Sequence, residues 1–180
     1  MFSVLTWNVE NLFRPSQTAT PQEFQHYNDK LGLLAQVINQ LNPDVVALQE
    51  IGGLEPLLDL QTACGYPHRD ISNFPDHRHI RVAFLSNRPI IAREDIVDFP
   101  VGPALTIFDL TATSTVPITR MSRGALRIRV LHPGMNIDII TAHLKSKLLS
   151  FPRVGGSSFQ PRDEDERGSA ISWREMSITH

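Results

Sequence analysis

The first fifty residues carry the hydrophobic pattern of a strand, a helix and a second strand. Residues 2–7 alternate between apolar and polar positions, which predicts a strand ending near Asn8. After a polar stretch, apolar residues recur three and four positions apart, as on one face of a helix. They are Tyr27, Leu31, Leu34, Val37, Ile38 and Leu41. Asn42-Pro43 ends this helix, and the apolar run at residues 45–48 is typical of a buried strand.

Shorter elements are predicted for the rest of the chain, with strands more frequent than helices. A short helix is expected at 54–63, a long loop at 65–79, strands at 81–85, 90–99 and 105–110, and a hairpin of 125–131 with 135–142. Residues 150–160, rich in Gly, Ser and Pro, predict a surface loop, and a charge run follows at 162–167. This order of elements favours an α/β sandwich over a doubly wound sheet.

Composition limits the classes of protein that fit. A chain of 180 residues with 41% hydrophobic content can form one globular domain with a core. The formal net charge of −2 gives no overall basic excess, so any contact with nucleic acid would be local. Cys64 is the only cysteine, which excludes an intrachain disulfide and a Cys-rich zinc site. Neither a signal peptide nor an apolar run of about 18 residues is recognisable, and we expect a cytoplasmic protein without a membrane span.

Polar residues follow the first two predicted strands directly. Asn8 and Glu10 come after the first strand, and Glu50 comes at the end of the second. If these strands are neighbours in one sheet, the three side chains converge on one rim. Mg²⁺ is commonly bound through one or two carboxylates together with water and substrate phosphate. Taken singly, Asn8 is equally typical of a turn or a cap, and Glu50 of a helix cap.

Two further groups of polar residues suit a phosphate anion. His143 and Lys145 follow the last predicted strand, and Arg123 precedes the strand at 125–131. Arginine can bind phosphate with two hydrogen bonds. Taken singly, His143 is also typical of a structural histidine and Lys145 of a solvated face, so the prediction rests on their combination.

Five segments resemble the ordered sequence blocks of the endonuclease/exonuclease/phosphatase superfamily, which has the DNase I-like fold. They are TWNVENLF, VVALQEIG, RVAFLS, SRGALRI and TAHLKSK. The resemblance covers residues 2–167 and leaves 168–180 as an atypical tail. It implies a four-layered α/β sandwich built from two packed sheets. It also implies Mg²⁺-dependent hydrolysis of a phosphoester, most simply by a nuclease-like phosphodiesterase, with Mn²⁺ able to substitute. The implied partner is a phosphodiester substrate, with nucleic acid among the candidates.

The same resemblance implies a role for each candidate. Glu50 would be the main Mg²⁺ ligand, and Glu10 falls where relatives carry a second acidic ligand. Asn8 would orient the scissile phosphate and the nucleophile. His143 would donate a hydrogen bond to a phosphate oxygen, and Arg123 would lie near the phosphate.

The chain departs from the family pattern after residue 167. The Gly-Asp-x-Asn and Ser-Asp-His blocks, which supply the orienting Asp and Asn and the general base, are not found. We therefore expect an incomplete sandwich that lacks its C-terminal half, with little turnover. A truncated or frameshifted coding sequence and a deliberately shortened chain both explain the tail. Two other functions stay open: an inactive phosphate-binding remnant, and an enzyme acting on a phospholipid or inositol-phosphate headgroup.

Half of a two-sheet sandwich would leave an apolar sheet face uncovered, so we also expect self-association. The expectation rests on Val82, Phe84, Ile128, Val130, Ile137 and Ile139.

A zinc site is a rival interpretation of the predicted loop. His68, Asp70, Asp76, His77 and His79 have the right chemistry. Prolines in the loop and the lack of a helical i, i+4 pair favour an ordinary loop. Residues 76–83 also resemble an Asp-x-Arg-Gly turn of the same superfamily.

Overall fold

The computed structural model describes residues 1–99, 107–108 and 117–144. The chain divides into two compact units. One contains Met1–Gly102 and Thr119–His143. The other contains Pro103–Ile118 and Leu144–His180, and its described strands are the antiparallel pair β6 (Ile107–Phe108) and β7 (Pro117–Ile118). The first unit holds the two larger sheets and every described candidate residue.

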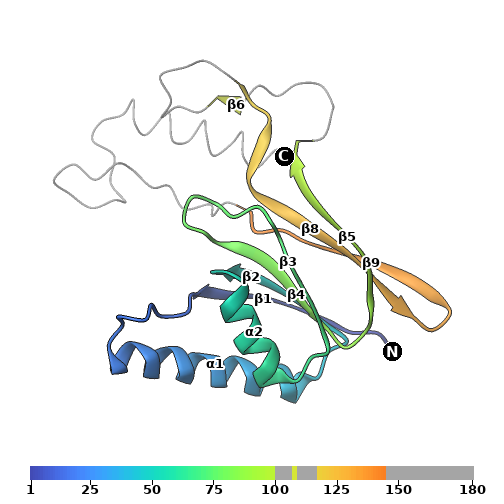
Figure 1. Cartoon of the computed structure of the whole chain (residues 1–180). Helices are drawn as coiled ribbons and strands as arrows, with labels where there is room; N and C mark the ends of the chain where they lie inside the picture. Colours follow the sequence, from blue (N-terminus) through green and yellow to red (C-terminus); the bar gives the residue numbers. More distant parts are fainter. Residues whose placement is uncertain (100–106, 109–116, 145–180) are drawn as a thin grey trace, which may run out of the picture. The chain divides into compact units, whose positions relative to one another are not determined.

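The chain opens with the predicted strand–helix–strand unit (Figure 1). Strand β1 (Val4–Leu12) pairs in parallel with β2 (Val45–Ile51), and α1 (Pro21–Leu41) connects them. The helix begins at a capping box, in which Thr20 and Glu23 each bond the other's backbone N–H. It ends at Asn42, which has left-handed backbone geometry. The parallel pairing brings the C-terminal ends of β1 and β2 to one edge.

Two antiparallel strands complete the first sheet, whose order is β1-β2-β4-β3. Helix α2 (Leu54–Cys64) confirms the short helix predicted there, and β4 (Arg81–Ser86) pairs with β2. The prediction of an uninterrupted loop over residues 65–79 is wrong, because β3 (His68–Ile71) pairs with β4 in this region. The polar sequence of β3 lacks the apolar pattern from which a strand is predicted. The pairing with β4 supplies the order that its own hydrophobic pattern does not indicate.

The second sheet has the order β5-β8-β9 and is antiparallel throughout. It contains β5 (Ile90–Asp98), β8 (Arg120–His132) and β9 (Met135–Thr141). The predicted hairpin of β8 with β9 is confirmed, and its turn places Gly134 at a φ of 83°, which glycine adopts at low cost. The predicted strand at 105–110 is realised only as β6 within the described residues.

Two hydrophobic cores hold this unit together. In the first core, buried residues of α1 and α2, including Ile38 and Leu60, pack on the first sheet. Val37 and Leu41, expected on the buried face of α1, are instead exposed. The described helices therefore form one layer and the two sheets form two more, an α/β sandwich.

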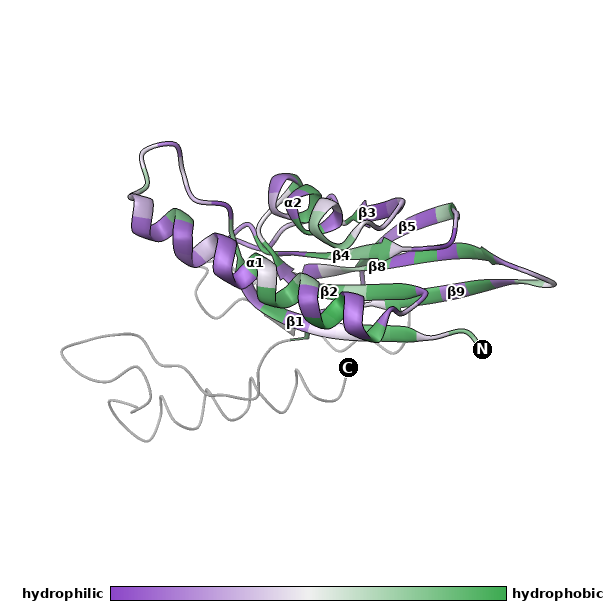
Figure 2. Ribbon diagram, turned by 90° about the horizontal axis from the view of Figure 1, so that it is seen from below, coloured by the Kyte–Doolittle hydropathy of each residue, from purple (hydrophilic) through white to green (hydrophobic). Residues whose placement is uncertain are grey.

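The second core lies between the two sheets, where apolar segments of β2, β4, β8 and β9 gather (Figure 2). It includes Val82 and Phe84 from one sheet and Ile128 and Val130 from the other, all buried, with Ile137 and Ile139 packed against them. The expectation that these six residues leave an apolar face uncovered is therefore wrong, because the two sheets cover each other. Self-association stays a prediction, but an uncovered apolar face formed by these six residues no longer supports it.

Neither described helix has the length and apolar character needed to cross a membrane.

Candidate functional site

Asn8 and Glu50 meet where the regular pairing of β1 with β2 ends. Asn8 is paired with Gln49 in the strand register, so Glu50 is the next residue along the neighbouring strand. The Asn8 side-chain amide donates a hydrogen bond from Nδ2 to Glu50 Oε1 at 3.1 Å. Asn8 Oδ1 accepts the backbone N–H of Glu10 at 2.9 Å. The predicted convergence of Asn8 and Glu50 is therefore confirmed, and both ends of the Asn8 amide are held.

Glu50 has an unusual backbone conformation. Its φ is 65°, in the left-handed region, and the register of β2 shifts against both neighbouring strands at this point. Such an irregularity re-aims a side chain at the end of a strand. Left-handed geometry in a residue other than glycine costs free energy and often marks a functional site. The side chain of Glu50 is 13% exposed, and its carboxylate lies close to His143 as well as to Asn8.

Glu10 is less closely connected to the rim. It lies within β1, which continues to Leu12 and so extends past the end predicted near Asn8, and it has a φ of 53° and an exposed side chain. Its backbone carbonyl accepts a hydrogen bond from Lys30 Nζ at 2.6 Å. Among the described residues its carboxylate has no hydrogen-bond or ion-pair partner, and no three His, Cys, Asp or Glu side chains cluster to hold a metal there. The role of Glu10 as a second ligand stays a prediction.

His143 reaches the same rim from the end of β9. Its Nε2 lies 3.3 Å from Glu50 Oε1, and its Nδ1 lies 3.0 Å from Nη1 of Arg123. Because a guanidinium can only donate, Nδ1 accepts, and the proton of the neutral ring sits on Nε2, facing the carboxylate. Burial lowers the pKa of His143 below its ordinary value, and the charge of Arg123 lowers it further, against the opposing effect of Glu50. The lowered pKa favours the neutral imidazole, and the contact with Arg123 favours the tautomer with its proton on Nε2.

Asp76 anchors the far end of this arrangement, a role that the sequence did not reveal. Its side chain is 1% exposed, and Oδ2 accepts a hydrogen bond from Arg123 Nε at 2.7 Å. Oδ1 accepts the backbone N–H groups of Arg78 and Ile80, at 2.8 and 3.0 Å. Burial alone would raise the pKa of Asp76, but the hydrogen bonds from Ile80, Arg123 and Arg78 outweigh burial and hold it below its usual range.

These partners leave the zinc interpretation without support in the described residues, since Asp76 is committed to Arg123 and to its own loop. The visible signal for Asp76 was its place in an Asp-x-Arg turn. Its partner 47 positions away was not visible.

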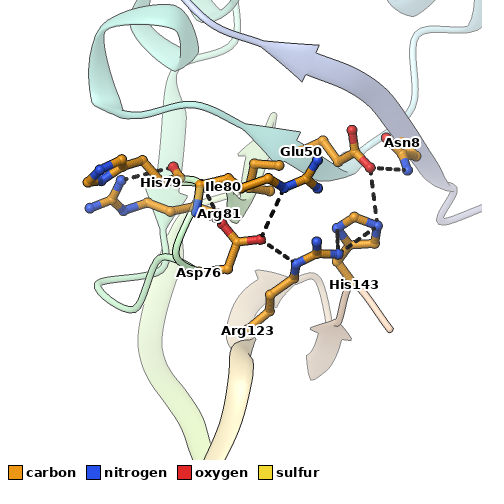
Figure 3. Close-up of polar contacts among 9 residues, drawn as sticks. Asn8, Glu50, Asp76, His79, Ile80, Arg81, Arg123 and His143 are labelled. Carbon is orange, nitrogen blue, oxygen red and sulfur yellow. Dashed lines mark hydrogen bonds and ion pairs between the residues drawn. The ribbon is translucent and has the colours of Figure 1, made fainter. Parts of the chain in front are cut away.

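The five side chains form one continuous polar chain, which runs Asp76, Arg123, His143, Glu50, Asn8 (Figure 3). They come from the loop before β4, from β8, from the end of β9, and from β2 and β1. The structure brings together four of the predicted residues, Arg123, His143, Glu50 and Asn8, and the roles assigned to them stay predictions. Chemically, the chain places one accessible carboxylate beside a neutral imidazole and a guanidinium. Such a site can take a divalent cation at the carboxylate and an anion at the nitrogen donors.

Arg78 brings a second arginine to this site. Its side chain is about half exposed, and its Nε lies 3.9 Å from the Asp76 carboxylate. Its positive charge also contributes to lowering the pKa of His143. Lys145, the other predicted phosphate ligand, lies outside the described residues.

Comparison with known proteins places this geometry in context. A family model described as "Endonuclease/Exonuclease/phosphatase family" matches residues 5–171. A comparison with curated protein sequences gives no match.

Several solved structures share the fold at low sequence identity. An endonuclease/exonuclease/phosphatase family protein from Leptotrichia buccalis has a TM-score of 0.51 at 20% identity, over 81% of this chain and 54% of its own. TDP2 from Caenorhabditis elegans, in truncated form, has a TM-score of 0.51 at 18% identity, over 81% of this chain and 47% of its own. D. rerio TDP2 complexed with a single-strand DNA product has a TM-score of 0.52 at 20% identity, over 99% and 55%. The chain thus spans about half the length of the solved structures it matches.

Proposed function

The chain belongs to the endonuclease/exonuclease/phosphatase family, and on that premise we propose that its site binds a divalent cation and acts on phosphodiester bonds. The observation that carries the proposal is the Glu50–His143 contact, which brings a carboxylate and a neutral imidazole from different sheets to 3.3 Å. Mg²⁺ is the proposed metal, with Mn²⁺ able to replace it. The reaction class is nuclease-like hydrolysis.

The site offers one carboxylate, that of Glu50, and this number is compatible with Mg²⁺. This ion commonly takes one or two protein carboxylates and completes its coordination with water and substrate phosphate, so a single accessible carboxylate is a sufficient protein contribution. Glu50 would hold the ion. When bound, the ion would offset negative charge on the phosphate and on the leaving oxygen.

The protein's own groups orient and neutralise the phosphate. Asn8 is fixed by two hydrogen bonds and holds the Glu50 carboxylate in one orientation. His143 carries its ring proton on the nitrogen that faces the rim, and can redirect this donor to a phosphate oxygen. Arg123 uses Nε for Asp76 and Nη1 for His143, so a phosphate would be met by Nη2. Preorganised donors of this kind stabilise developing charge without reorganisation.

Nucleic acid is the substrate class that we favour. D. rerio TDP2, which shares the fold, was solved with a single-strand DNA product. In this chain the net charge is −2, so attraction to a polyanion would depend on local cations such as Arg78 and Arg123. A phospholipid or inositol phosphate substrate, and binding of phosphate without turnover, are the alternatives. Low turnover by these 180 residues alone and a cytoplasmic location stay predictions.

Metal binding gives the direct test. Calorimetric titration of Mn²⁺ into the wild type, Glu50→Gln and Glu10→Gln should show affinity lost in Glu50→Gln and largely kept in Glu10→Gln. Glu10→Gln is the matched control, because it removes one carboxylate from the same end of the first sheet. Equal affinity in the wild type and Glu50→Gln would refute the metal assignment. Hydrolysis of bis-p-nitrophenyl phosphate, inhibited by EDTA and compared with release of phosphate from inositol phosphates, tests the reaction class.

A further inference from the structure

A buried amide next to Glu50 in the chain joins the two sheets. The side chain of Gln49, on β2, donates a hydrogen bond from Nε2 to the hydroxyl of Thr141, on β9, at 2.8 Å. The same nitrogen lies 3.2 Å from the hydroxyl of Thr6 on β1 and 3.3 Å from the carbonyl oxygen of Ala47. Gln49 and Thr141 are 9% and 4% exposed. A polar pair is therefore present at a position where water has little access.

The position of this pair along the chain connects it to the site. Gln49 immediately precedes Glu50, and Thr141 lies two residues before His143. Both residues of the Gln49–Thr141 bond are thus within two positions of the residues that form the 3.3 Å contact between Glu50 and His143. A shift of β9 along the first sheet would change both distances together.

The surrounding contacts do not fix that alignment by themselves. The second core beside the pair is apolar, with Ala47 and Val82 among its members. Hydrophobic contacts resist separation of the sheets, but they are non-directional and tolerate sliding. A hydrogen bond requires a short distance and a narrow range of angles. A buried hydroxyl without its partner is also costly, so a shifted β9 would leave Thr141 without the bond from Gln49.

The position of β9 at the edge of the second sheet makes its alignment depend further on the Gln49–Thr141 bond. Within the described residues, β9 pairs only with β8 and forms an edge of the second sheet. The end of β9 that leads to His143 is therefore held from one side by the ladder, where Leu126 is paired with Thr141. The Gln49 amide holds the same residue from the other sheet.

From this geometry we propose that Gln49 and Thr141 form an inter-sheet latch that sets the separation of Glu50 and His143. They are positioning residues, since neither contacts the rim itself. The proposal rests on the proposed function for its consequence, because the distance it sets matters most when a metal and a phosphate lie between the two side chains.

The first experiment asks whether the latch exists. Unfolding by urea is measured for Gln49→Met, Thr141→Val and the double variant, which remove the amide and the hydroxyl while nearly keeping side-chain volume. The double variant should lose less stability than the sum of the single variants, because the two groups share one bond. Additive losses would overturn the proposal. Ser86→Ala is the matched control: it removes a buried hydroxyl at the opposite end of the first sheet, where Ser86 pairs with Val45, and should be additive with Gln49→Met.

The second experiment asks whether the latch positions His143. In the metal-free protein, the ring resonances of His143 should move in Thr141→Val, return toward the wild type in Thr141→Ser, and stay unchanged in Ser86→Ala. Unmoved resonances in Thr141→Val would overturn the proposal, whatever its effect on stability. A movement in Ser86→Ala equal to that in Thr141→Val would do the same, since the effect would then follow from lost stability alone.

Mn²⁺ separates this proposal from the proposed function. Paramagnetic broadening falls with the sixth power of distance, so in Thr141→Val a displacement of the His143 ring away from the ion should weaken its broadening by Mn²⁺ severalfold. Absence of broadening in the wild type would count against the metal site at Glu50 and leave the latch to be decided by the metal-free measurements. Equal broadening in the wild type and Thr141→Val would overturn the latch.

Discussion

Asp76 accepts a hydrogen bond from Arg123 at 2.7 Å, although 47 positions separate the two residues in the chain. The bond crosses from the loop before β4 to the start of β8. This bond orients the Arg123 guanidinium so that its Nη1 lies 3.0 Å from Nδ1 of His143. A buried carboxylate with three donors is thus the fixed point from which the orientation of Arg123 follows.

Replacement of Asp76 by Asn should destabilise the protein and loosen Arg123. The amide can keep only part of the acceptor function, and a largely buried guanidinium would lose its charged partner. We expect a loss of about 1–3 kcal/mol in the free energy of unfolding, measured by urea denaturation. The control is Asp98→Asn, which breaks the exposed pair of Asp98 with Arg120 and should cost less than about 0.5 kcal/mol. Equal losses in the two variants would contradict the anchoring role of Asp76.

The titration of His143 should respond with opposite signs to its two neighbours. Its pKa lies below the ordinary 6.5, because burial and Arg123 disfavour the charged ring while Glu50 favours it. In Arg123→Met the pKa should rise, and in Glu50→Gln it should fall further. The ring resonances followed by NMR between pH 4 and 9 give both values. Shifts of the same sign in the two variants would mean that lost burial, rather than charge, dominates the titration.

The same lowered pKa fixes the sign of a stability effect. The folded state binds less proton at His143 than the unfolded state does, so this contribution to stability is fully present above the ordinary pKa of 6.5. It is lost as the pH falls through the folded-state pKa. Urea midpoints measured from pH 8 to pH 5 should fall more steeply in the wild type than in His143→Gln.

Glycine should be tolerated better than alanine at position 50. The φ of 65° at Glu50 is unfavourable for any residue with a Cβ, by about 1 kcal/mol or more, and favourable for glycine. Both Glu50→Gly and Glu50→Ala remove the carboxylate, so their melting temperatures compare backbone strain alone. Glu50→Gly is expected to be the more stable of the two. In an ordinary strand position the order would be reversed. A more stable Glu50→Ala would show that the strain is relieved in solution.

Gly124 should not accept a side chain, because β5 passes too close. A Cβ at this position would lie 2.6 Å from Cγ1 of Val97 and 3.1 Å from the carbonyl oxygen of Ile96. Gly124→Ala is expected to cost about 1–3 kcal/mol and to displace the adjacent Arg123. The double variant Gly124→Ala with Val97→Ala removes the closer clash and should recover part of the loss, as measured by urea unfolding. A double variant less stable than both single variants would argue against steric conflict as the cause.

Much of the site was predictable from sequence because its members follow apolar strands directly. Glu50 lies next to the end of β2 and His143 just beyond β9, while Asn8 lies where the regular pairing of β1 with β2 ends. The parallel pairing of β1 and β2, a polarity that the sequence did not determine, then brings Asn8 and Glu50 together.

Other features depend on partners that no local pattern indicates. The strand β3 is polar and owes its conformation to β4. The local sequence around Asp76 is that of an ordinary loop, and only the structure shows that Asp76 accepts a hydrogen bond from Arg123. Alternation along β4 and β8 predicted one apolar face on each, but could not reveal that these faces cover each other.

The Gln49–Thr141 bond closes a loop of 92 residues, and this has a consequence for the order of folding. Contacts between residues distant in sequence form late, because the entropy of closing the intervening chain must be overcome first. The strand–helix–strand unit with Asn8 and Glu50 can assemble early, since its contacts are comparatively local. His143 joins it only after the β8–β9 hairpin has docked. In a refolding experiment, the environment of the His143 ring would therefore report completion of the domain, later than the recovery of helical signal from α1.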